Sequence, residues 1–597
     1  PICDETVPLS VHSTNWQSAE SDLPTTRNLV FQELEKGWIY KYDGTLEDAQ
    51  QEFGDKLAIG KLGLALSDTR PPRLVVDSSI CGVNNRCSIP EKTTLPSAQD
   101  VMRAYPLRNS NEPMVGFSLD IKSAHKLVVI RESDRGLLGF TLDGAIYFYK
   151  VAPFGATFSA YHWTRVGSFI LRCIHFLLWW THAGFIYVDD FCFLFPEKVA
   201  WIMSSMCCVL AQVLRIPISW RKTEFGPRVQ WIGWQFHITA GFISLPQNKV
   251  DKLGEYISVM RKSSRTSKKS LEKLVGLLNW ITQIFLLMRC WLPILYRDLY
   301  HIPASHYSID PGHWKHVIDC LDDDLQFFKT PTGTGIPIGS KLLAVRHQAV
   351  TCKADLHQIY LSERRTWLRV RDPSSVRRSL SADSHRVLQL YADWLQSVSL
   401  VKCLRPKQLW SGRCAADAMA SSDICQIGGF IYFPSGTVIW FSEKFTFNDF
   451  AALDIPVTKE MQKCIASFET LAQIAILYIF SRSSPGFRFP LRIPSLTDNT
   501  GTEAGGNKLF STKSPLNHFL EKLTLLCTIS GMELDLSHIS GDRNEEADAL
   551  SRWDFISEPP FNHELHNRFP ISLHQLWHPE TSVSLHPPET FLSWEPP

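Results

Sequence analysis

The sequence predicts a multidomain protein of the α+β class, and three features of the chain lead to this prediction. Its 597 residues are enough for roughly three to five domains, and its 44% hydrophobic and 20% charged residues are typical of globular chains. Short β-favouring runs alternate with runs of helical period. Two distant parts of the chain place acidic residues at the ends of strand-like runs, which predicts two domains that each carry an acidic site.

The first acidic segment is GFIYVDDFCFLF, residues 184–195, where Asp189 and Asp190 separate two β-favouring runs. A hairpin turn or a chance surface pair is the ordinary explanation for two adjacent aspartates. Here only the acids separate the runs, which predicts a tight hairpin with carboxylates at its tip and a buried body. Unpaired buried carboxylates are costly, and a divalent metal would offset their repulsion.

A third acid, Asp120, follows a short apolar strand in FSLDIKSAHKLVVI. Four further blocks accompany it: PRLVVDSSICGVN, VAPFGATFSAYHW, YVDD and ISWRKTEFGPRVQWIGWQF. In this order the blocks resemble reverse transcriptases of retroelements, most similar to those of LTR- and DIRS-type retrotransposons, over residues 61–300. The resemblance implies a right-hand polymerase of fingers, palm and thumb. It also implies two Mg²⁺ (or Mn²⁺) ions, bridged by Asp120 and Asp189 with Asp190 adjacent, that serve nucleotidyl transfer.

The same resemblance implies where the incoming nucleotide binds. Arg73 and Lys61 would contact the triphosphate, a role that suits a bidentate guanidinium. Phe154 and Gly155 match the loop that packs the nucleotide and the template base.

Other positions imply leaving-group chemistry, sugar selection and primer binding. Lys222 matches a lysine that protonates pyrophosphate, although a solvated surface lysine is the simpler alternative. His125 stands where the family has Tyr or Phe as a wall against the ribose 2′-hydroxyl, so we expect weaker sugar discrimination. Trp231, Gly233 and Trp234 match the hairpin that grips the primer end.

A basic run at residues 261–269, which includes Lys268 and Lys269, precedes apolar residues at helical spacing. A solvated loop is one explanation. A thumb helix against duplex phosphates is the other, and the position in the chain favours it.

The second acidic region lies in the C-terminal part. Residues 429–433 and 437–441 flank a Pro-Ser-Gly turn, which predicts a hairpin, and residues 487–493 alternate as a later strand. The expected element order β-β-β-α-β-α-β-α resembles ribonuclease H. The resemblance implies a second two-metal site, and His538 would assist proton transfer or product release. The four metal ligands implied in this way are Asp417, Glu469, Asp498 and Asp548.

These predictions divide the chain into consecutive regions. They are an N-terminal extension (1–60), fingers and palm (61–235), thumb (236–330), a connection or linker (331–408), a ribonuclease H domain (409–555) and a loosely ordered tail (556–597). The region that begins at Pro1 is expected to be part of a longer polyprotein.

Composition limits the environment and the partners. A net charge of +1 does not by itself indicate a nucleic-acid partner. The 15 cysteines follow no CxxC pattern, which favours reduced thiols and an intracellular location, cytoplasmic or nuclear. The most membrane-like stretch, residues 166–186, is interrupted by Arg172, His175 and His182, so we expect a buried helix that runs into the hairpin strand, and no membrane.

The functional hypothesis is therefore an RNA-directed DNA polymerase with a ribonuclease H domain. Its partners would be an RNA template, a DNA primer, the RNA:DNA hybrid and dNTPs. A decayed or domesticated copy that only binds nucleic acid is the alternative, and acids at all seven metal positions argue against it. An RNA-copying polymerase of another class is a third possibility, which a ribonuclease H domain disfavours.

Overall fold

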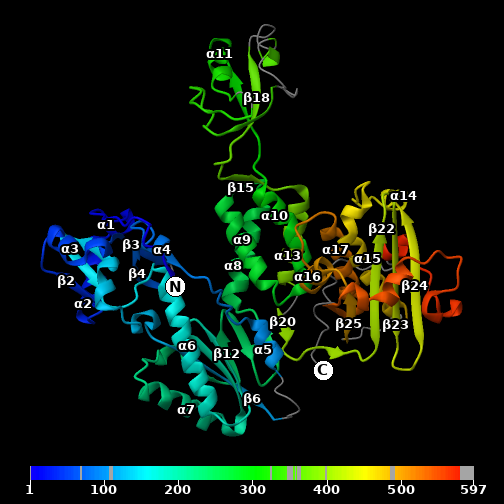
Figure 1. The fold of residues 1–597 in the computed structure, drawn as a ribbon, viewed down its shortest axis with the longest axis horizontal. Helices are drawn as coiled ribbons and strands as arrows, with labels where there is room; N and C mark the ends of the chain where they lie inside the picture. Colours follow the sequence, from blue (N-terminus) through cyan, green and yellow to red (C-terminus); the bar gives the residue numbers. More distant parts are fainter. Residues whose placement is uncertain are drawn as a thin grey trace. The chain divides into compact units, whose positions relative to one another are not determined.

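The computed structural model describes residues 2–67, 70–105, 112–322, 324, 326–345, 354–356, 358, 365–396, 400–483 and 491–578. The chain divides into two compact units (Figure 1). The first comprises Pro1–Ser244 and Cys403–Arg405, and the second comprises Leu245–Lys402 and Pro406–Pro597. Both units combine helices with sheets, so the predicted mixture of helix and strand is confirmed.

The first unit begins with a five-stranded sheet in the order β2-β8-β7-β3-β4. Helix α2 (Leu23–Glu35) shares a hydrophobic core with this sheet. The predicted N-terminal extension therefore supplies a strand and a helix to the same core as the following residues. The strands are β2 (Ile39–Tyr42), β3 (Ile59–Ser67), β4 (Arg70–Asp77), β7 (Gly139–Leu142) and β8 (Ala145–Tyr149).

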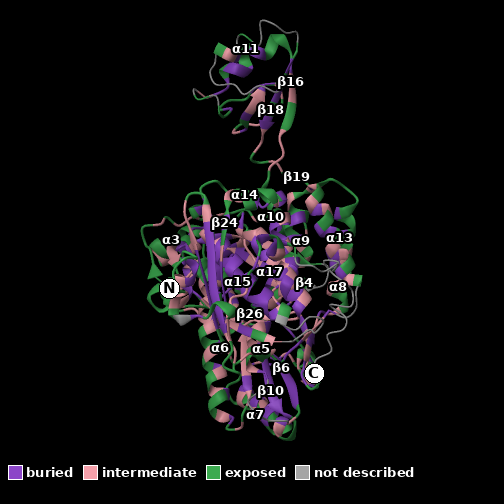
Figure 2. Cartoon of the chain, turned by 90° about the vertical axis from the view of Figure 1, so that its right-hand side faces the viewer, coloured by how far each residue is buried: buried purple, intermediate pink, exposed green. Residues whose placement is uncertain are grey.

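A second sheet of the first unit has the order β11-β6-β10-β9. Its strands are β6 (Met114–Asp120), β9 (Ala183–Tyr187), β10 (Asp190–Pro196) and β11 (Glu224–Gly226). After Asp190, β10 is buried throughout (Figure 2), and this burial accounts for its continuous apolar sequence. The two strands of the predicted acidic hairpin are thus confirmed as β9 and β10.

Helices α6 (Thr157–Leu177) and α7 (Ala200–Val213) pack on this second sheet. The expectation that residues 166–186 form a helix that runs into the hairpin strand is confirmed, because α6 ends at Leu177 and β9 follows. The expectation that this helix is buried holds for one face only, since Phe169 and Phe176 are exposed.

Three antiparallel strands follow: β12 (Arg228–Trp231), β13 (Trp234–His237) and β14 (Phe242–Ser244). Ile232 and Gly233 form the turn between the first two strands, with φ angles of 44° and 84°. Positive φ at both central residues matches the right-handed twist of the flanking strands. Because β13 crosses the predicted boundary at residue 235, that boundary does not separate two folding units.

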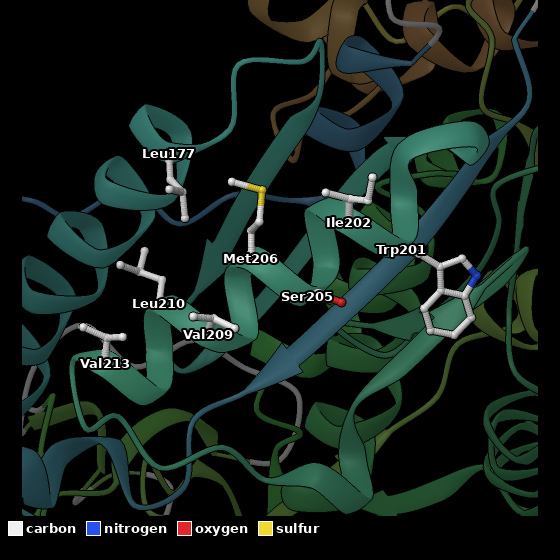
Figure 3. A pocket seen from close by; sticks show the side chains of 8 residues that line it. All are labelled: Leu177, Trp201, Ile202, Ser205, Met206, Val209, Leu210 and Val213. Atoms are coloured by element: carbon white, nitrogen blue, oxygen red, sulfur yellow. The ribbon is translucent and has the colours of Figure 1, made fainter.

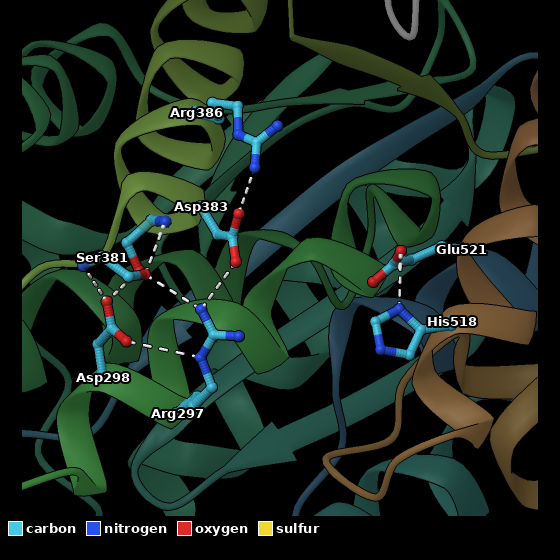
Figure 4. Close-up of polar contacts among 8 residues, drawn as sticks. Arg297, Asp298, Ser381, Asp383, Arg386, His518 and Glu521 are labelled. Atoms are coloured by element: carbon cyan, nitrogen blue, oxygen red, sulfur yellow. Dashed lines mark hydrogen bonds and ion pairs between the residues drawn. The ribbon is translucent and has the colours of Figure 1, made fainter. Parts of the chain in front are cut away.

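Four helices of the second unit form one group, in which polar contacts join α10 to α13. They are α8 (Gln247–Arg261), α9 (Lys268–Ile281), α10 (Leu292–Tyr300) and α13 (Ala382–Gln396). Arg297 on α10 lies 3.1 Å from Asp383 on α13 (Figure 4). The buried Asp298 carboxylate accepts hydrogen bonds of 2.6 Å from the Ser381 amide and the Ser384 hydroxyl. These contacts hold the first turn of α13 against α10.

A small three-stranded sheet has the order β16-β18-β17 and packs with helix α11 (Pro311–Asp319). Its strands are β16 (Ser305–Ile309), β17 (Lys341–Val345) and β18 (Thr366–Arg371). Residues from both sides of position 331 share this core, so the predicted division between thumb and connection runs through one body.

The C-terminal sheet carries the predicted hairpin, which is confirmed as β23 (Ile424–Tyr432) and β24 (Val438–Thr446). Strand β22 (Arg413–Ala420) pairs with β23 in antiparallel fashion and with β25 (Leu491–Thr497) in parallel. Strand β26 (Glu533–His538) lies parallel to β25, and β21 (Gln408–Leu409) also pairs with β25. The predicted strand at residues 487–493 lies outside the described residues up to position 490.

Helices α15 (Ile465–Ser483) and α17 (Leu516–Ser530) pack in the core of this sheet, whereas α18 (Glu545–Ser551) contacts β22 and β23 (Figure 1). The expectation of a loose tail is wrong for residues 571–577. Ile571, Leu576 and Trp577 are buried in the core with α15 and α17, because they supply apolar area that the sheet layer alone lacks.

Among the described residues, one helical segment, Met461–Arg482, is long and apolar enough to cross a membrane by length and composition alone. The most apolar 18 residues of this segment have a mean hydropathy of 1.6, and 83% of them are buried inside the protein. The segment includes most of α15, whose apolar character therefore serves the core of the sheet.

Candidate active sites

The first site forms at the turn between β9 and β10. Val188 and Asp189 make this turn, and Val188 has a φ of 59°, a strained value for a β-branched residue. The Trp163 indole N–H donates a 2.7 Å hydrogen bond to the Val188 carbonyl and so supports the strained backbone.

Strand register brings the three predicted acids of this site together. Asp190 lies directly opposite Asp120 on β6. The amide of Ile121, the residue after Asp120, donates a 2.9 Å hydrogen bond to the Asp189 carbonyl. Two neighbouring strands and one turn therefore place three carboxylates at a single strand end.

Burial and repulsion from neighbouring carboxylates raise the pKa of Asp189 and Asp190. The pKa of Asp190 rises to about 7, chiefly because the carboxyl is desolvated and then because Asp120 and Asp189 are close. Desolvation also raises the pKa of Asp189. The Lys222 ammonium lies 2.8 Å from Oδ2 of Asp120 and offsets part of the negative charge.

The donor set fits a divalent cation. Asp120, Asp189 and Asp190 offer carboxylate oxygens, the ligands that Mg²⁺ and Mn²⁺ prefer. The neighbouring carboxylates repel Asp190 and help to raise its pKa, and a bound cation would offset this repulsion.

Two of the predicted nucleotide-binding residues contact the ring of a third, Phe154. The His125 ring lies 5.6 Å from it in an edge-on arrangement, and the Arg73 guanidinium lies 5.9 Å from its centroid. Gly155 has a φ of 108°, and a Cβ atom there would lie 2.0 Å from the Val76 carbonyl oxygen. A residue without a side chain is required where this loop approaches β4.

Lys61 is not placed beside Arg73. It lies on β3 opposite Asp77, whereas Arg73 faces Ala65. Four residues along a strand correspond to about 13 Å. The Lys61 ammonium lies 5.2 Å from the centroid of the Trp16 ring.

The hairpin of β12 and β13, which was predicted to grip a primer end, is hydrogen-bonded to the first acidic site. Trp231 and Trp234 are buried, and the Trp231 indole N–H donates a 3.1 Å hydrogen bond to the Asp190 carbonyl. The two indoles are therefore not available as a contact surface, whereas Gln230 is exposed and Ile232 and Gly233 in the turn are half-buried. The link from Trp231 to Asp190 has no signal in the sequence.

Sequence reasoning also missed a buried ion pair next to the predicted sugar wall. Lys126, which follows His125, lies 3.1 Å from Glu33 on α2. Its ammonium is 4.1 Å from the centroid of the Tyr149 ring, within cation–π range. The pair joins the short helix that carries His125 to the first sheet's core.

The predicted thumb lysines lie in the second unit, where Lys268 and Lys269 begin α9. The Lys268 amide donates a 2.6 Å hydrogen bond to the Val376 carbonyl, and its ammonium lies 3.6 Å from Glu272. Lys269 is exposed and open to an anionic partner.

A second acidic cluster lies on the C-terminal sheet. Asp417 from β22, Glu469 from α15 and Asp498 after β25 each offer a carboxylate oxygen, and these oxygens lie within 4.8 Å of one another. These three residues could hold a metal ion. Burial raises the pKa of both Asp417 and Glu469, and the neighbouring carboxylates raise it further. The Ser551 hydroxyl donates a 2.5 Å hydrogen bond to Asp417.

The remaining predicted nuclease residues border this cluster. Asp548 is not one of the converging three; its carboxylate pairs with Arg552 at 2.7 Å. The His538 Nε2 atom lies 3.0 Å from the Asp498 carbonyl oxygen. Asn544 is buried, and both polar atoms of its side chain lack a hydrogen-bond partner among the described residues.

Comparisons with known proteins give structural matches alone. No family model and no curated protein matches the chain. A structure of the foamy viral protease-reverse transcriptase with dsDNA matches at 12% identity and a TM-score of 0.42, covering 91% of this chain and 88% of that chain. The same viral protein in complex with an RNA/DNA hybrid matches at 12% identity and a TM-score of 0.42, covering 91% of this chain and 57% of that chain.

Proposed function

We propose that this chain is the RNA-directed DNA polymerase of a retroelement and that its C-terminal domain is a ribonuclease H. One observation carries the polymerase assignment. Asp120 and Asp190 are cross-strand neighbours, and Asp189 lies in the adjoining two-residue turn. With the sequence resemblance to reverse transcriptases, this arrangement favours two-metal nucleotidyl transfer over a structural role.

The residues of the first unit have separate tasks in this proposal. Bound Mg²⁺ would be held by Asp120, Asp189 and Asp190 and would stabilise charge on the transferring phosphate. Lys222 is placed to hold a proton near Asp120 that can pass to the departing pyrophosphate. Arg73 is exposed beside Phe154, where its planar guanidinium can accept a triphosphate.

Primer extension on an RNA template with dNTPs and Mg²⁺ tests the polymerase assignment. Asp189→Asn should abolish extension while hybrid binding stays largely intact, because only a charged ligand is removed. Asp43→Asn, at an exposed acid of the same unit, is the matched control and should extend normally. Normal extension by Asp189→Asn would contradict the assignment.

The nuclease assignment rests on the buried cluster of Asp417, Glu469 and Asp498. Asp498→Asn should abolish cleavage of the RNA strand in an RNA:DNA hybrid and leave primer extension unchanged. His538→Ala should slow cleavage without eliminating it, because the carboxylates remain. The control is Asp542→Asn at a solvent-facing position near the cluster. Loss of both activities in a folded Asp498→Asn variant would mean that the two sites do not act independently.

The same assays separate the alternatives. A decayed copy would bind the hybrid and show neither extension nor cleavage. A polymerase that copies RNA into RNA would extend the primer with rNTPs in preference to dNTPs.

A further inference from the structure

An apolar groove lies on the first unit between the end of α6 and the outer face of α7, and neither acidic cluster contributes a residue to it. Its volume is about 660 Å³. Leu177 from α6 faces a row of α7 side chains across it (Figure 3). The α7 residues that line it are Trp201, Ile202, Ser205, Met206, Val209, Leu210 and Val213.

The side chains of this surface are unusually exposed for their type. Trp201 is 71% exposed, Val209 is 61% exposed and Val213 is 72% exposed. Helix α7 contains no Asp, Glu, Lys or Arg. Contiguous exposed apolar patches of this kind mark interaction sites on soluble proteins.

We infer that α7 is the contact surface between two copies of this chain, related by a two-fold axis. The first argument is area. Trp201, Ile202, Val209 and Val213 together expose on the order of 400 Å² of apolar surface. Two residues close to Leu177 in sequence, Phe176 and Trp179, are 95% and 72% exposed. They add roughly 300–400 Å² of exposed apolar surface. The sum approaches the ~800 Å² that each partner contributes to a standard specific interface.

The second argument is charge. A two-fold contact places each residue near an equivalent surface of the other copy, so a charged patch would repel itself. The groove lining is uncharged and avoids this cost. The lack of basic residues on α7 also disfavours a lipid surface, since interfacial helices carry Lys and Arg on their polar face.

The third argument is the spacing of the exposed residues. Trp201, Ser205, Val209 and Val213 follow one another at intervals of four and are all exposed, so they form a ridge along α7. Ridges of this spacing interlock when two helices cross at about −50°. Trp201 and Val213 are separated by about 18 Å along the helix.

A two-fold axis between Ser205 and Val209 makes this ridge complementary to itself. In antiparallel register it places Trp201 of one copy over Val213 of the other, and Ser205 opposite Val209. The small serine at the centre allows the backbones to approach, and the large indole fills the groove at each end.

Sedimentation equilibrium of the full-length chain tests the inference. The wild type should form a dimer. Val209→Lys should raise the dissociation constant about 30-fold or more, as expected for loss of a central interface residue. The matched control is Val259→Lys, because Val259 is a valine of α8 with a similar exposure of 59%, and it should leave the constant unchanged.

A charge-swap pair tests the antiparallel register. Trp201→Lys and Val213→Glu should each weaken the dimer. The double variant should bind at least about tenfold more tightly than either single variant, because its opposite charges meet across the interface. Circular dichroism confirms that each variant is folded.

Three results would overturn the inference. The first is a wild type that stays monomeric at tens of micromolar. The second is a dimer that Val209→Lys leaves intact, which would place the contact elsewhere. The third is a monomer that binds phosphatidylcholine vesicles and loses that binding with Trp201→Lys, which would make the surface a lipid contact.

Discussion

The Lys222 ammonium lies 2.8 Å from Oδ2 of Asp120, so a cation from the turn before β11 occupies the acidic site of the first unit. The Lys222 side chain is largely exposed, whereas the Asp120 side chain is nearly buried. The lysine is therefore free to leave the carboxylate when another cation binds. A residue that both balances the acids and faces solvent is suited to proton delivery.

Lys222→Met should lower the turnover number of primer extension by ~10²- to 10⁴-fold, the usual contribution of a general acid. The Michaelis constant for dNTP should change much less, because binding of the nucleotide does not depend on the transferred proton. Single-turnover extension over a range of pH measures the effect. Lys222→Arg retains the charge and is the comparison. An unchanged turnover number in Lys222→Met would leave only a charge-balancing role.

The raised pKa of Asp190 predicts a pH-dependent stability of the metal-free chain. Its folded pKa is about 7 and its ordinary value is 3.8. Between these values the folded chain binds more protons than the unfolded chain, so the free energy of unfolding falls as pH rises. The stabilisation by Asp190 is present below about pH 4 and is lost by about pH 7.

Thermal unfolding in EDTA from about pH 4 to pH 8 measures this dependence, and Asp190→Asn should flatten it. Mg²⁺ should raise the unfolding temperature more at about pH 8 than at about pH 5, because the ionised carboxylate binds it. Parallel pH profiles for the wild type and Asp190→Asn would show that other groups dominate.

His125→Tyr should improve the preference for dNTPs over rNTPs by roughly tenfold or more, the scale of a steric change in a binding pocket. The His125 ring contacts the Phe154 ring and the Ser159 carbonyl. A tyrosine side chain is longer and would extend farther toward the expected position of the nucleotide sugar. Burial lowers the pKa of His125, so the wild-type ring is neutral near pH 7. Ratios of kcat/KM for the two nucleotide types provide the measurement. Equal ratios in the two proteins would remove His125 as the sugar gate.

Gly155→Ala should impair nucleotide binding and cost at least about 2 kcal/mol of stability. Its φ of 108° is strained for alanine, and the new Cβ would lie 2.0 Å from the Val76 carbonyl oxygen. Relief of this clash would displace Phe154 and raise the Michaelis constant for dNTP. Gly144→Ala is the matched control, since Gly144 has a φ of 76° with open space around it and should cost about 1 kcal/mol. Similar losses in both variants would show that backbone strain alone explains the effect.

The sequence was informative wherever one face of an element carries the signal. The apolar runs around Asp189 and Asp190 predicted β9 and β10. The turn itself lies one residue earlier than predicted, at Val188 and Asp189, and Asp190 is the first residue of β10. The resemblance to ribonuclease H implied that Asp417, Glu469 and Asp498 would meet, and their carboxylate oxygens lie within 4.8 Å of one another. The period of a helix or a strand shows which of its residues face the core, so elements with a buried face can be predicted from the sequence.

The sequence does not predict a contact between two residues that lie far apart in the chain and on different elements. Lys126 and Glu33 are 93 positions apart, and nothing marks either as buried. The bond from Ser551 to Asp417 spans 134 positions. Asp548, which was expected among the metal ligands, pairs with Arg552 one helical turn later and also helps to raise the pKa of Asp417. Side-chain choices among several partners depend on the assembled structure.

The hydrogen bond from Ser551 to Asp417 has a consequence for the order in which the two sites are completed during synthesis. Asp120, Asp189, Asp190 and Lys222 have all left the ribosome before the second half of the chain is made. Strand β22, which carries Asp417, must wait until α18 emerges more than a hundred residues later to receive Ser551. The nascent chain thus acquires the residues of its first acidic site early, and the second acidic site receives its Ser551 hydrogen bond only after α18 has been made.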